Sequence, residues 1–350
     1  MPDIMEERMK QMMEARREIN AQFGAVKAKA VPYWEGIPCY EEEAVVKLAL
    51  LSNEIQREHS SQERAEMIRA FEALLTEVKA REDAPEKILL WPEGKMPAET
   101  EYTDNSDHRY NHDPDFRPYL IEMLLPEDVT PKGALALCAG GDHAEAVVHE
   151  AYQTAKDFNA LGYQCFLILN RTNHNPWNGK EVGADCARAL RYIRKNAAKY
   201  RIDPHQVAFA GFSNGGLSGE QTIAYYSGEK KVQDYFPDYE PDELDAYYGA
   251  PDAFLCVYGP RFVGGTIDWE GVVYPPVFYA VGREDTALDN LNYVYPEMLA
   301  HGVPAEIHTF AGVPHGKAGS SIMNDSYANF DLWVPLADAF MQDVYQKAGR

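Results

Sequence analysis

The chain is poor in basic residues: it has 33 Lys and Arg against 55 Asp and Glu, which gives a formal net charge of -22 over 350 residues. An acidic surface of this kind repels the phosphates of nucleic acids and of anionic membranes. The sequence also has no apolar run of about 18 residues or more, so no transmembrane helix is expected. We therefore expect neither nucleic acid nor a membrane among the partners of this chain.

Cysteine is scarce as well, with an odd total of five residues and no Cys-x-x-Cys pair. They are Cys39, Cys138, Cys165, Cys186 and Cys256. Several stand in apolar runs, where a cysteine usually behaves as a small buried hydrophobe. Residues 1–29 lack the apolar segment and the small-residue cleavage site of a signal peptide. We therefore expect a reducing, cytoplasmic compartment.

Residues 1–85 differ in composition from the rest of the chain. They are rich in Met, Glu, Lys, Arg and Ala, and three runs place apolar residues at helical spacing, for example Ile68, Phe71 and Leu75. Short amphipathic helices need a packing partner in water. We expect a helical extension that forms a lid on the main domain or joins copies of the chain in a homo-oligomer. Helices that lie on a membrane are the alternative, which the mixed charge of the polar faces disfavours.

Residues 86–118 are rich in Pro, Asp, Asn and Tyr, and we expect an irregular connector there. This segment holds a group of residues with the chemistry of metal ligands: Asp104, Asp107, His108, His112, Asp113 and Asp115. The two His side chains would need a helix to bring them to one face, and Pro114 and Pro118 break such a helix. We therefore expect no metal ion and no cofactor.

From residue 119 to residue 350, short apolar runs alternate with helical stretches. The expected strands cover residues 119–125, 133–139, 163–169, 207–210, 253–258, 276–281 and 305–310. The expected helices cover residues 144–161, 182–200, 214–226, 288–301 and 329–346. Strands that are apolar throughout are buried on both faces, which is typical of a parallel sheet between two layers of helices. The sequence therefore predicts an α/β fold with a mostly parallel central sheet.

The motif Gly-Phe-Ser-Asn-Gly at residues 211–215 lies between a predicted strand and a predicted helix. A serine on such a sharp turn, called a nucleophile elbow, stands exposed above the sheet and near the positive end of a helix dipole. The turn leaves no room for side chains beside the serine, which explains Gly211 and Gly215. The alternative is a glycine-rich turn with a serine that caps the helix. The strand–turn–helix context favours Ser213 as a nucleophile.

A serine hydroxyl needs a base, and the base needs a carboxylate that orients it. In a fold with a nucleophile elbow these partners follow the serine in the order acid, then His. Asp285 comes shortly after the last but one predicted strand, and His315 comes shortly after the last. We predict a triad of Ser213, Asp285 and His315, with His315 as the general base. Glu284 is the alternative acid.

Acyl transfer also needs N–H groups that stabilise the oxyanion of the tetrahedral intermediate. The residue after the nucleophile, Asn214, is expected to supply one of them. The other is expected from the loop after the strand 133–139, where Gly140 and Gly141 let the backbone turn its amides towards the substrate. We assign Gly141 or Asp142 as this second donor. An ordinary Gly-Gly turn is the alternative.

These motifs resemble those of the α/β-hydrolase-fold serine esterases, near the acetyl-xylan-esterase-like and hormone-sensitive-lipase-like carboxylesterases. The matching segments begin near residue 110 and reach the C-terminus. They include Gly140 with Gly141, His149 with Glu150, residues 187–194, 202–204, 211–216 and 251–253, and His315 with Gly316. The resemblance implies the α/β-hydrolase fold, with a catalytic domain over residues 119–350 and no cofactor.

The resemblance also implies the hydrolysis of short-chain carboxylic esters through an acyl-enzyme, with a small-molecule ester or an acetylated oligosaccharide as the substrate. Asp142 stands where the family usually has a third glycine. Trp177 and Trp269 lie on connections expected near the carboxyl ends of the strands, where α/β sites form. We expect these two side chains to line the substrate pocket, and packing within the loops is the alternative.

Two other functions stay open at the level of the sequence. A peptidase or amide hydrolase of the same fold would normally bring a large substrate-selecting domain, and the N-terminal part of this chain looks helical instead. A non-catalytic binding protein of this fold would usually have lost a member of the triad, and none is missing. A fluorophosphonate that reacts with activated serines would separate an enzyme from a binding protein.

Overall fold

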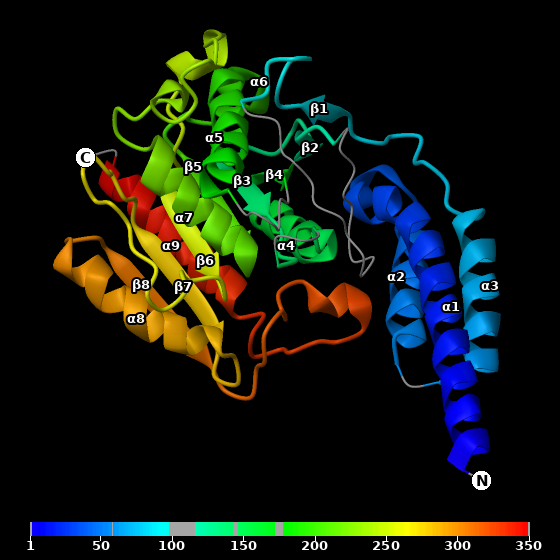
Figure 1. Cartoon of the computed structure of the whole chain (residues 1–350). Coiled ribbons are helices and arrows are strands. Elements are labelled where there is room, and N and C mark those ends of the chain that lie inside the picture. The colour runs from blue at the N-terminus through cyan, green and yellow to red at the C-terminus, as the bar shows by residue number, and fades with distance from the viewer. Residues whose placement is uncertain (1, 58, 98–115, 143–145, 172–177, 349–350) are drawn as a thin grey trace. The chain divides into compact units, whose positions relative to one another are not determined.

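The structure is a computed structural model, and it describes residues 2–57, 59–97, 116–142, 146–171 and 178–348. These residues fall into two compact units that are separated in the chain after Ala84 (Figure 1). The first, the helical unit, contains three N-terminal helices, and the second, the sheet unit, contains all the strands named below. Within the described residues, no helix combines the length and the apolar character that a passage through a bilayer requires.

The helical unit is built from α1 (Pro2–Glu35), α2 (Glu42–Ile55) and α3 (Ser61–Leu75), with the short 3-10 helix η1 (Ile37–Cys39) between the first two. Ser60 caps α3, because its hydroxyl accepts a hydrogen bond from the N–H of Glu63 and its own N–H donates to the Glu63 carboxylate. The buried residues of the common core are Phe23, Val26, Ala30, Leu48, Ile55, Ile68 and Phe71. The expected N-terminal helical extension is confirmed.

Eight strands form one sheet in the order β1-β2-β4-β3-β5-β6-β7-β8. They are β1 (Lys87–Leu89), β2 (Tyr119–Met123), β3 (Ala134–Cys138), β4 (Gln164–Leu169), β5 (Val207–Phe212), β6 (Ala253–Val257), β7 (Val277–Gly282) and β8 (Ala305–Phe310). The pairs β1–β2 and β2–β4 are antiparallel, and all other neighbours are parallel. Every residue of β3 to β7 is buried, as continuous apolar runs predict. The expected α/β fold with a mostly parallel sheet is confirmed.

The segment 86–118, which we expected to be irregular throughout, contributes a strand to the sheet. β1 pairs with β2 at the outer edge, and Leu90 and Trp91 directly after it are buried. The strand has only three residues, and its end residues are exposed. So short and exposed a segment carries no alternating apolar pattern, and periodicity could not predict it.

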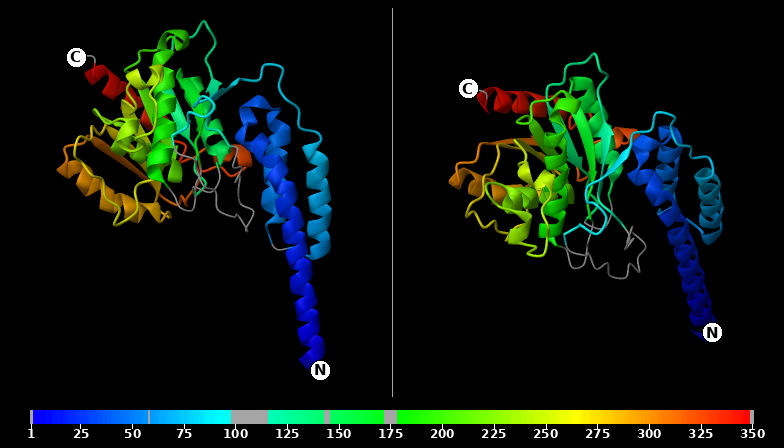
Figure 2. Two further views of the ribbon diagram at one scale, coloured as in Figure 1. Left: turned by 45° about the horizontal axis from the view of Figure 1, so that its top comes forward. Right: turned by 90° about the horizontal axis from the view of Figure 1, so that it is seen from above.

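Helices cover both faces of the sheet (Figures 1 and 2). α4 (Val148–Leu161) and α9 (Trp333–Ala348) pack on one face, while α5 (Gly179–Lys195), α7 (Asn214–Tyr226) and α8 (Ala287–Ala300) pack on the other. The remaining short helices of this unit are α6 (Ala197–Tyr200), η2 (Val232–Asp234), η3 (Glu243–Ala246) and η4 (Ser320–Met323).

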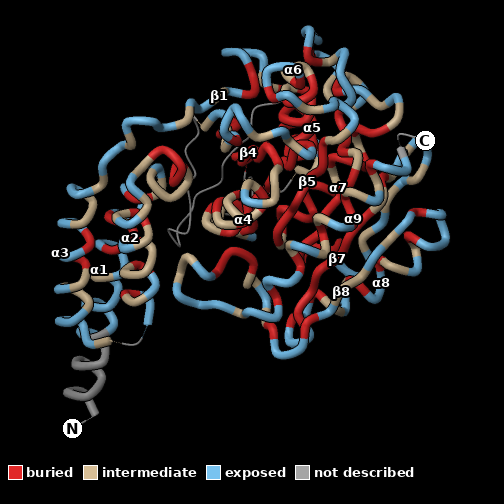
Figure 3. The backbone as a smooth tube through the Cα atoms, turned by 180° about the vertical axis from the view of Figure 1, so that it is seen from behind, coloured by how far each residue is buried: buried red, intermediate tan, exposed pale blue. Residues whose placement is uncertain are grey.

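The parallel strands β3 to β8 all end at one side of the sheet, which we name the carboxyl edge, and begin at the other, the amino edge. Figure 3 shows that buried residues run along the central strands and the helices against them. Loops that leave the carboxyl edge therefore stand on a rigid core. In open α/β sheets, binding sites form between such loops.

Candidate active site

Ser213 alone forms the turn between β5 and α7. Its backbone has φ 52° and ψ -122°, a conformation that residues with a Cβ rarely adopt. A Cβ on Gly211 would overlap the carbonyl group of Gly215, and a Cβ on Gly215 would overlap the carbonyl group of Cys138. The sequence-based explanation of these two glycines, a turn too tight for side chains, is confirmed.

The turn is also held by the neighbouring strand β6 and the connection that follows it. The N–H of Ser213 donates to the carbonyl oxygen of Val257 at 3.0 Å. Gly259 lies so close that a Cβ there would overlap the carbonyl oxygen of Ser213. Contacts from β6 and from the connection after it thus maintain the strained backbone of Ser213. The role of Gly259 was not predicted from the sequence, although a glycine directly after a buried strand can mark a close approach of two backbone segments.

Three side chains from three different connections meet at the carboxyl edge. Oγ of Ser213 lies 2.9 Å from Nε2 of His315, and Nδ1 of His315 lies 2.8 Å from Oδ2 of Asp285. Asp285 is buried, and its second carboxylate oxygen accepts a hydrogen bond from the N–H of Ala287 at 2.8 Å. The structure therefore brings the three residues of the predicted triad into one hydrogen-bonded chain.

The electrostatics of the three hydrogen-bonded side chains, Ser213, His315 and Asp285, suit proton transfer. The hydrogen bond to Asp285 raises the pKa of His315, although the partial burial of the imidazole opposes the rise. Because the carboxylate accepts a hydrogen bond from the N–H at Nδ1, Nε2 is left without a proton and is the acceptor that faces Ser213. Glu284, the alternative acid, is exposed, and no hydrogen bond joins it to His315 in the part of the chain that the structure describes.

Close backbone contacts hold the acid and the base at their separation. A Cβ on Gly282, the last residue of β7, would overlap the carbonyl group of Val313. The N–H of Glu284 donates to the same carbonyl oxygen at 3.1 Å. The loops that carry Asp285 and His315 are therefore joined by their main chains.

The predicted oxyanion donors lie beside the nucleophile in the chain or on the loop after β3. Gly141 has φ 132° and Asp142 has φ 56°, so the backbone turns sharply at these two residues. Asn214 is the first residue of α7, whose N-terminal N–H groups carry partial positive charge. Asp142 is exposed. The assignment of Asn214 and of Gly141 or Asp142 as donors stays a prediction.

The two tryptophans predicted to line the substrate pocket have different outcomes. Trp177 lies outside the described residues. The ring of Trp269 stacks on His301 with centroids 3.8 Å apart, and its Nε1 donates to Glu297 at 2.7 Å. Both partners belong to the C-terminal end of α8, a helix that begins just after Asp285. The structure thus does not bring Trp269 to the triad, and its contacts are those of a packing residue.

Neither metal chemistry nor thiol chemistry finds support among the described residues. No three His, Cys, Asp or Glu side chains gather there as a metal site would require. The acidic and His-rich group at residues 104–115 lies outside the described residues. All five cysteines are buried, which agrees with the expectation that those in apolar runs act as small hydrophobes.

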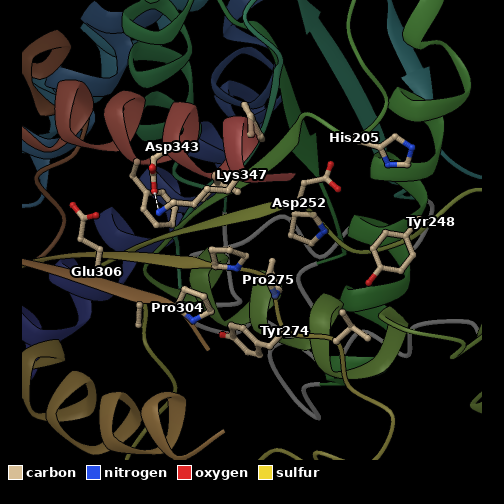
Figure 4. A pocket seen from close by; sticks show the side chains of 16 residues that line it. His205, Tyr248, Asp252, Tyr274, Pro275, Pro304, Glu306, Asp343 and Lys347 are labelled. Atoms are coloured by element: carbon tan, nitrogen blue, oxygen red, sulfur yellow. Dashed lines mark hydrogen bonds and ion pairs between the residues drawn. The ribbon is translucent and has the colours of Figure 1, made fainter. Parts of the chain in front are cut away.

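A pocket of about 810 Å³ lies away from the triad, at the amino edge of the sheet (Figure 4). Its lining includes residues just before the strands, such as His205, Asp252 and Pro304, and residues of the last turns of α9, such as Asp343 and Lys347. No residue of the predicted triad or oxyanion loop lines it. The length of the strands separates this pocket from the hydrogen-bonded chain at the carboxyl edge.

Known proteins resemble this chain in sequence over part of its length. The family described as BD-FAE matches residues 139–246. The chain is 28% identical over 158 residues to endo-1,4-beta-xylanase B of Butyrivibrio fibrisolvens, a match that covers 43% of this chain and 23% of that protein. It is 23% identical over 234 residues to an acetylxylan esterase of Xylanibacter ruminicola, which covers 63% of this chain and 46% of that protein. The chain therefore spans less than half the length of these two relatives.

Solved structures resemble the chain over more of its length. An acetyl ester-xyloside bifunctional hydrolase from Caldicellulosiruptor lactoaceticus matches with a TM-score of 0.56 and 21% identity, over 74% of this chain and 96% of that one. An α/β hydrolase enzyme named MGS-M1, from a Medee basin deep-sea metagenome library, matches with a TM-score of 0.52 and 19% identity, over 74% of this chain and 97% of that one. The sheet unit has the α/β-hydrolase fold.

Proposed function

We propose that this chain, with its α/β-hydrolase fold, is a carboxylic ester hydrolase in which Ser213 is the nucleophile, His315 the general base and Asp285 the residue that orients the base. One observation carries the proposal: the hydrogen-bonded chain from Ser213 through His315 to Asp285, with distances of 2.9 and 2.8 Å. The strained backbone of Ser213 supports it, because such strain is typical of nucleophile elbows.

In the first half of the reaction, Oγ of Ser213 attacks the carbonyl carbon of the ester while Nε2 of His315 takes the Oγ proton. The tetrahedral intermediate collapses when the bond to the alcohol oxygen breaks, and His315 gives its proton to the departing alcohol. The acyl group stays on Ser213. Asp285 stabilises the imidazolium that forms between these two steps.

In the second half, water replaces the alcohol. His315 takes a proton from the water as its oxygen attacks the acyl carbon. When the bond to Oγ of Ser213 breaks, His315 returns this proton to Oγ and the carboxylic acid leaves. In both halves the negative charge on the former carbonyl oxygen needs N–H donors that are in place before the reaction. The N-terminal end of α7 and the loop after β3 are where we assign them.

For the substrate, we propose acetyl and other short acyl esters of carbohydrates. Support comes from the relatives, since one is an acetylxylan esterase and one solved structure is of an acetyl ester-xyloside bifunctional hydrolase. A cytoplasmic location, and a role of residues 1–85 as a lid or in a homo-oligomer, stay predictions from the sequence.

The variant Ser213→Ala tests the function. We expect it to lower kcat on p-nitrophenyl acetate by roughly 10⁶-fold, because the nucleophile is lost while the fold remains. It should also lose labelling by a fluorophosphonate. Ser61→Ala is the matched control, because Ser61 is an exposed serine in the helical unit and should keep full activity and labelling. Near-wild-type turnover by the Ser213 variant would reject the assignment.

A panel of esters tests the substrate class on the wild-type chain. We expect acetyl and propionyl esters to have a higher kcat/KM than octanoyl esters, and acetylated xylo-oligosaccharides to release acetate. A preference for long acyl chains would reject the short-acyl proposal while leaving the esterase proposal intact.

A further inference from the structure

Glu150 is a buried carboxyl group that the reaction described above does not use. It lies in the first turn of α4, and only 4% of its surface is exposed. Burial raises the pKa of this carboxyl to about 7. Among the described residues, His315 is the basic group whose charge lowers this pKa. Burial of a carboxylate without a directly paired cation is costly. A group of this kind next to an active site suggests a role in the reaction.

One oxygen of Glu150 holds the start of the loop after β3. The N–H of Gly140 donates to Oε2 of Glu150 at 3.0 Å, and the carbonyl oxygen of Gly140 accepts from the N–H of Val147 at 2.8 Å. Gly140 is also wedged in place, since a Cβ on it would lie 2.8 Å from Oε2 of Glu150 and 3.0 Å from Cβ of Ser213. The carboxylate and the nucleophile thus face each other across a single glycine.

The other oxygen of Glu150 reaches the loop of the base through Tyr258. The hydroxyl of Tyr258 donates to Oε1 of Glu150 at 2.9 Å and accepts from the N–H of Ala318 at 3.2 Å. The ring of Tyr258 lies against the imidazole of His315, with centroids 5.0 Å apart. Tyr258 has φ 40°, an outlier for a bulky residue. The surrounding contacts must therefore hold it in this conformation.

We propose that Glu150, together with Tyr258, is a positioning residue of the esterase: its carboxylate ties the oxyanion loop after β3 and the loop that carries His315 to one point. The inference rests on the proposed function, because these two loops have catalytic roles only in that reaction. The proposal also reduces the number of candidates for the second oxyanion donor. The N–H of Gly140 is engaged by Glu150, so the loop's donor to the substrate must come from a later residue, Gly141 or Asp142.

A positioning role affects the reaction more than the binding of substrate. The N–H donors and Nε2 of His315 act mainly in the transition state, so their displacement lowers kcat with little change in KM. The carboxylate has a second effect, because its negative charge helps to raise the pKa of His315. Among the described residues, Tyr258 and His315 are the titratable groups that interact with Glu150. His149, its neighbour in α4, has a pKa of about 4 because it is buried, and it is neutral near pH 7.

The test compares Glu150→Gln and Tyr258→Phe with the wild-type full chain. We expect each variant to lower kcat on p-nitrophenyl acetate by up to about 10²-fold, with KM nearly unchanged, because small displacements of reacting groups have effects of that size. Glu150→Gln should also move the acid limb of the kcat/KM profile to lower pH, since it removes a negative charge near His315. Tyr258→Phe removes a hydrogen bond that lowers the pKa of Glu150, so this carboxyl is protonated more readily and the acid limb should move in the same direction. The double variant should lose less than the product of the two single losses.

Tyr163→Phe is the matched control, because the Tyr163 hydroxyl is also hydrogen-bonded to a carboxylate but lies at the amino edge. We expect it to keep kcat, even where urea unfolding shows the same loss of stability as in Tyr258→Phe. If Glu150→Gln and Tyr258→Phe are folded and keep wild-type kcat, or lose no more than Tyr163→Phe does, the positioning role is rejected while the esterase proposal stands. A wild-type chain that neither hydrolyses esters nor reacts with the fluorophosphonate rejects the proposed function and this inference with it.

Discussion

The two edges of the sheet differ in how their charges and backbone are arranged. At the amino edge, the acidic residues that line the pocket of Figure 4 have nearby partners: Asp252 pairs with Arg194 at 2.8 Å, and Asp343 pairs with Lys347. At the carboxyl edge, no Lys or Arg of the described residues pairs with the buried Glu150, and its pKa is raised to about 7.

Strained backbone conformations also occur at the carboxyl edge. Asp142, Ser213 and Tyr258, three of the non-glycine residues with left-handed φ, all follow strands at the carboxyl edge. The pocket of about 810 Å³ lies at the amino edge, and the charged residues Asp252 and Asp343 in its lining are paired. Backbone strain and buried charged groups reduce the stability of a fold, and both are typical of functional sites. In this chain both features occur beside the proposed triad.

Among the changes that test the difference between the two edges, Asp285→Asn is expected to have the largest effect. It removes the charge of the buried Asp285 carboxylate at the carboxyl edge. We expect kcat to fall about 10⁴-fold, because the base loses both its orientation and the stabilisation of its imidazolium. Asp285 raises the pKa of His315, and only neutral His315 acts as a base. The acid limb of the wild-type profile should therefore lie above the usual imidazole pKa, and the variant's limb should move to lower pH.

Asp289→Asn is the control for that variant, since Asp289 is an exposed carboxylate one turn along α8. It should leave both kcat and the pH profile unchanged. An Asp285 variant with wild-type kcat would mean that the reaction needs no buried charge at the carboxyl edge. The functional difference between the two edges would then be rejected.

A smaller effect is expected from Gly215→Ala, which adds one methyl group below the nucleophile turn. The methyl group would overlap the carbonyl of Cys138, so the turn must shift. We expect a loss of roughly 1–3 kcal/mol in the free energy of unfolding and a loss of kcat of about 10²-fold. Gly302→Ala is the control, because a Cβ there meets no heavy atom within 4 Å, although its φ is 69°. It should lower stability only modestly and keep kcat, as measured by urea unfolding and ester hydrolysis.

The smallest effect is expected from a change at the amino edge. Tyr248→Ala opens the wall of the pocket in Figure 4 and removes the ring that lies on Arg194, 5.5 Å from the guanidinium. We expect a loss of stability of about 0.5–1 kcal/mol and a change in kcat/KM of less than about twofold. Tyr248→Phe keeps the ring and loses only the hydroxyl that accepts from the N–H of Gly228 at 3.4 Å, so it should keep kcat/KM and most of the stability. A large loss of kcat/KM in a stable Tyr248→Ala variant would show that the amino edge takes part in the reaction.

The sequence predicted much of the site because its signals are local. The serine turn, its two glycines and the strand and helix beside it lie within about 20 residues, where periodicity and turn chemistry are readable. The acid and the base followed from chain order, since each comes directly after a predicted strand. The preference for Asp285 over Glu284 also agrees with the geometry, in which Asp285 is buried and bonded to His315.

Other features were hidden because they depend on contacts far apart in the chain. The place of β1 next to β2 and the contact of Gly259 with the nucleophile turn leave no periodic pattern. Trp269 lies on a connection after a strand, as predicted, but that connection carries it back towards the end of α8. A loop residue's position in the sequence does not tell how far it lies from the strand end.

The amino-acid sequence by itself determined the α/β class, the helical extension and the three residues of the proposed triad, because each depends on a local pattern or on chain order. Tertiary structure alone brought Glu150 to Tyr258, a residue 108 positions away, and placed them beside the nucleophile and the base. In the sequence, Glu150 is one acidic residue at the start of a helix, where such residues are common. Only the fold removes water from its carboxylate, and that burial turns an ordinary helix residue into a group that can position a reaction.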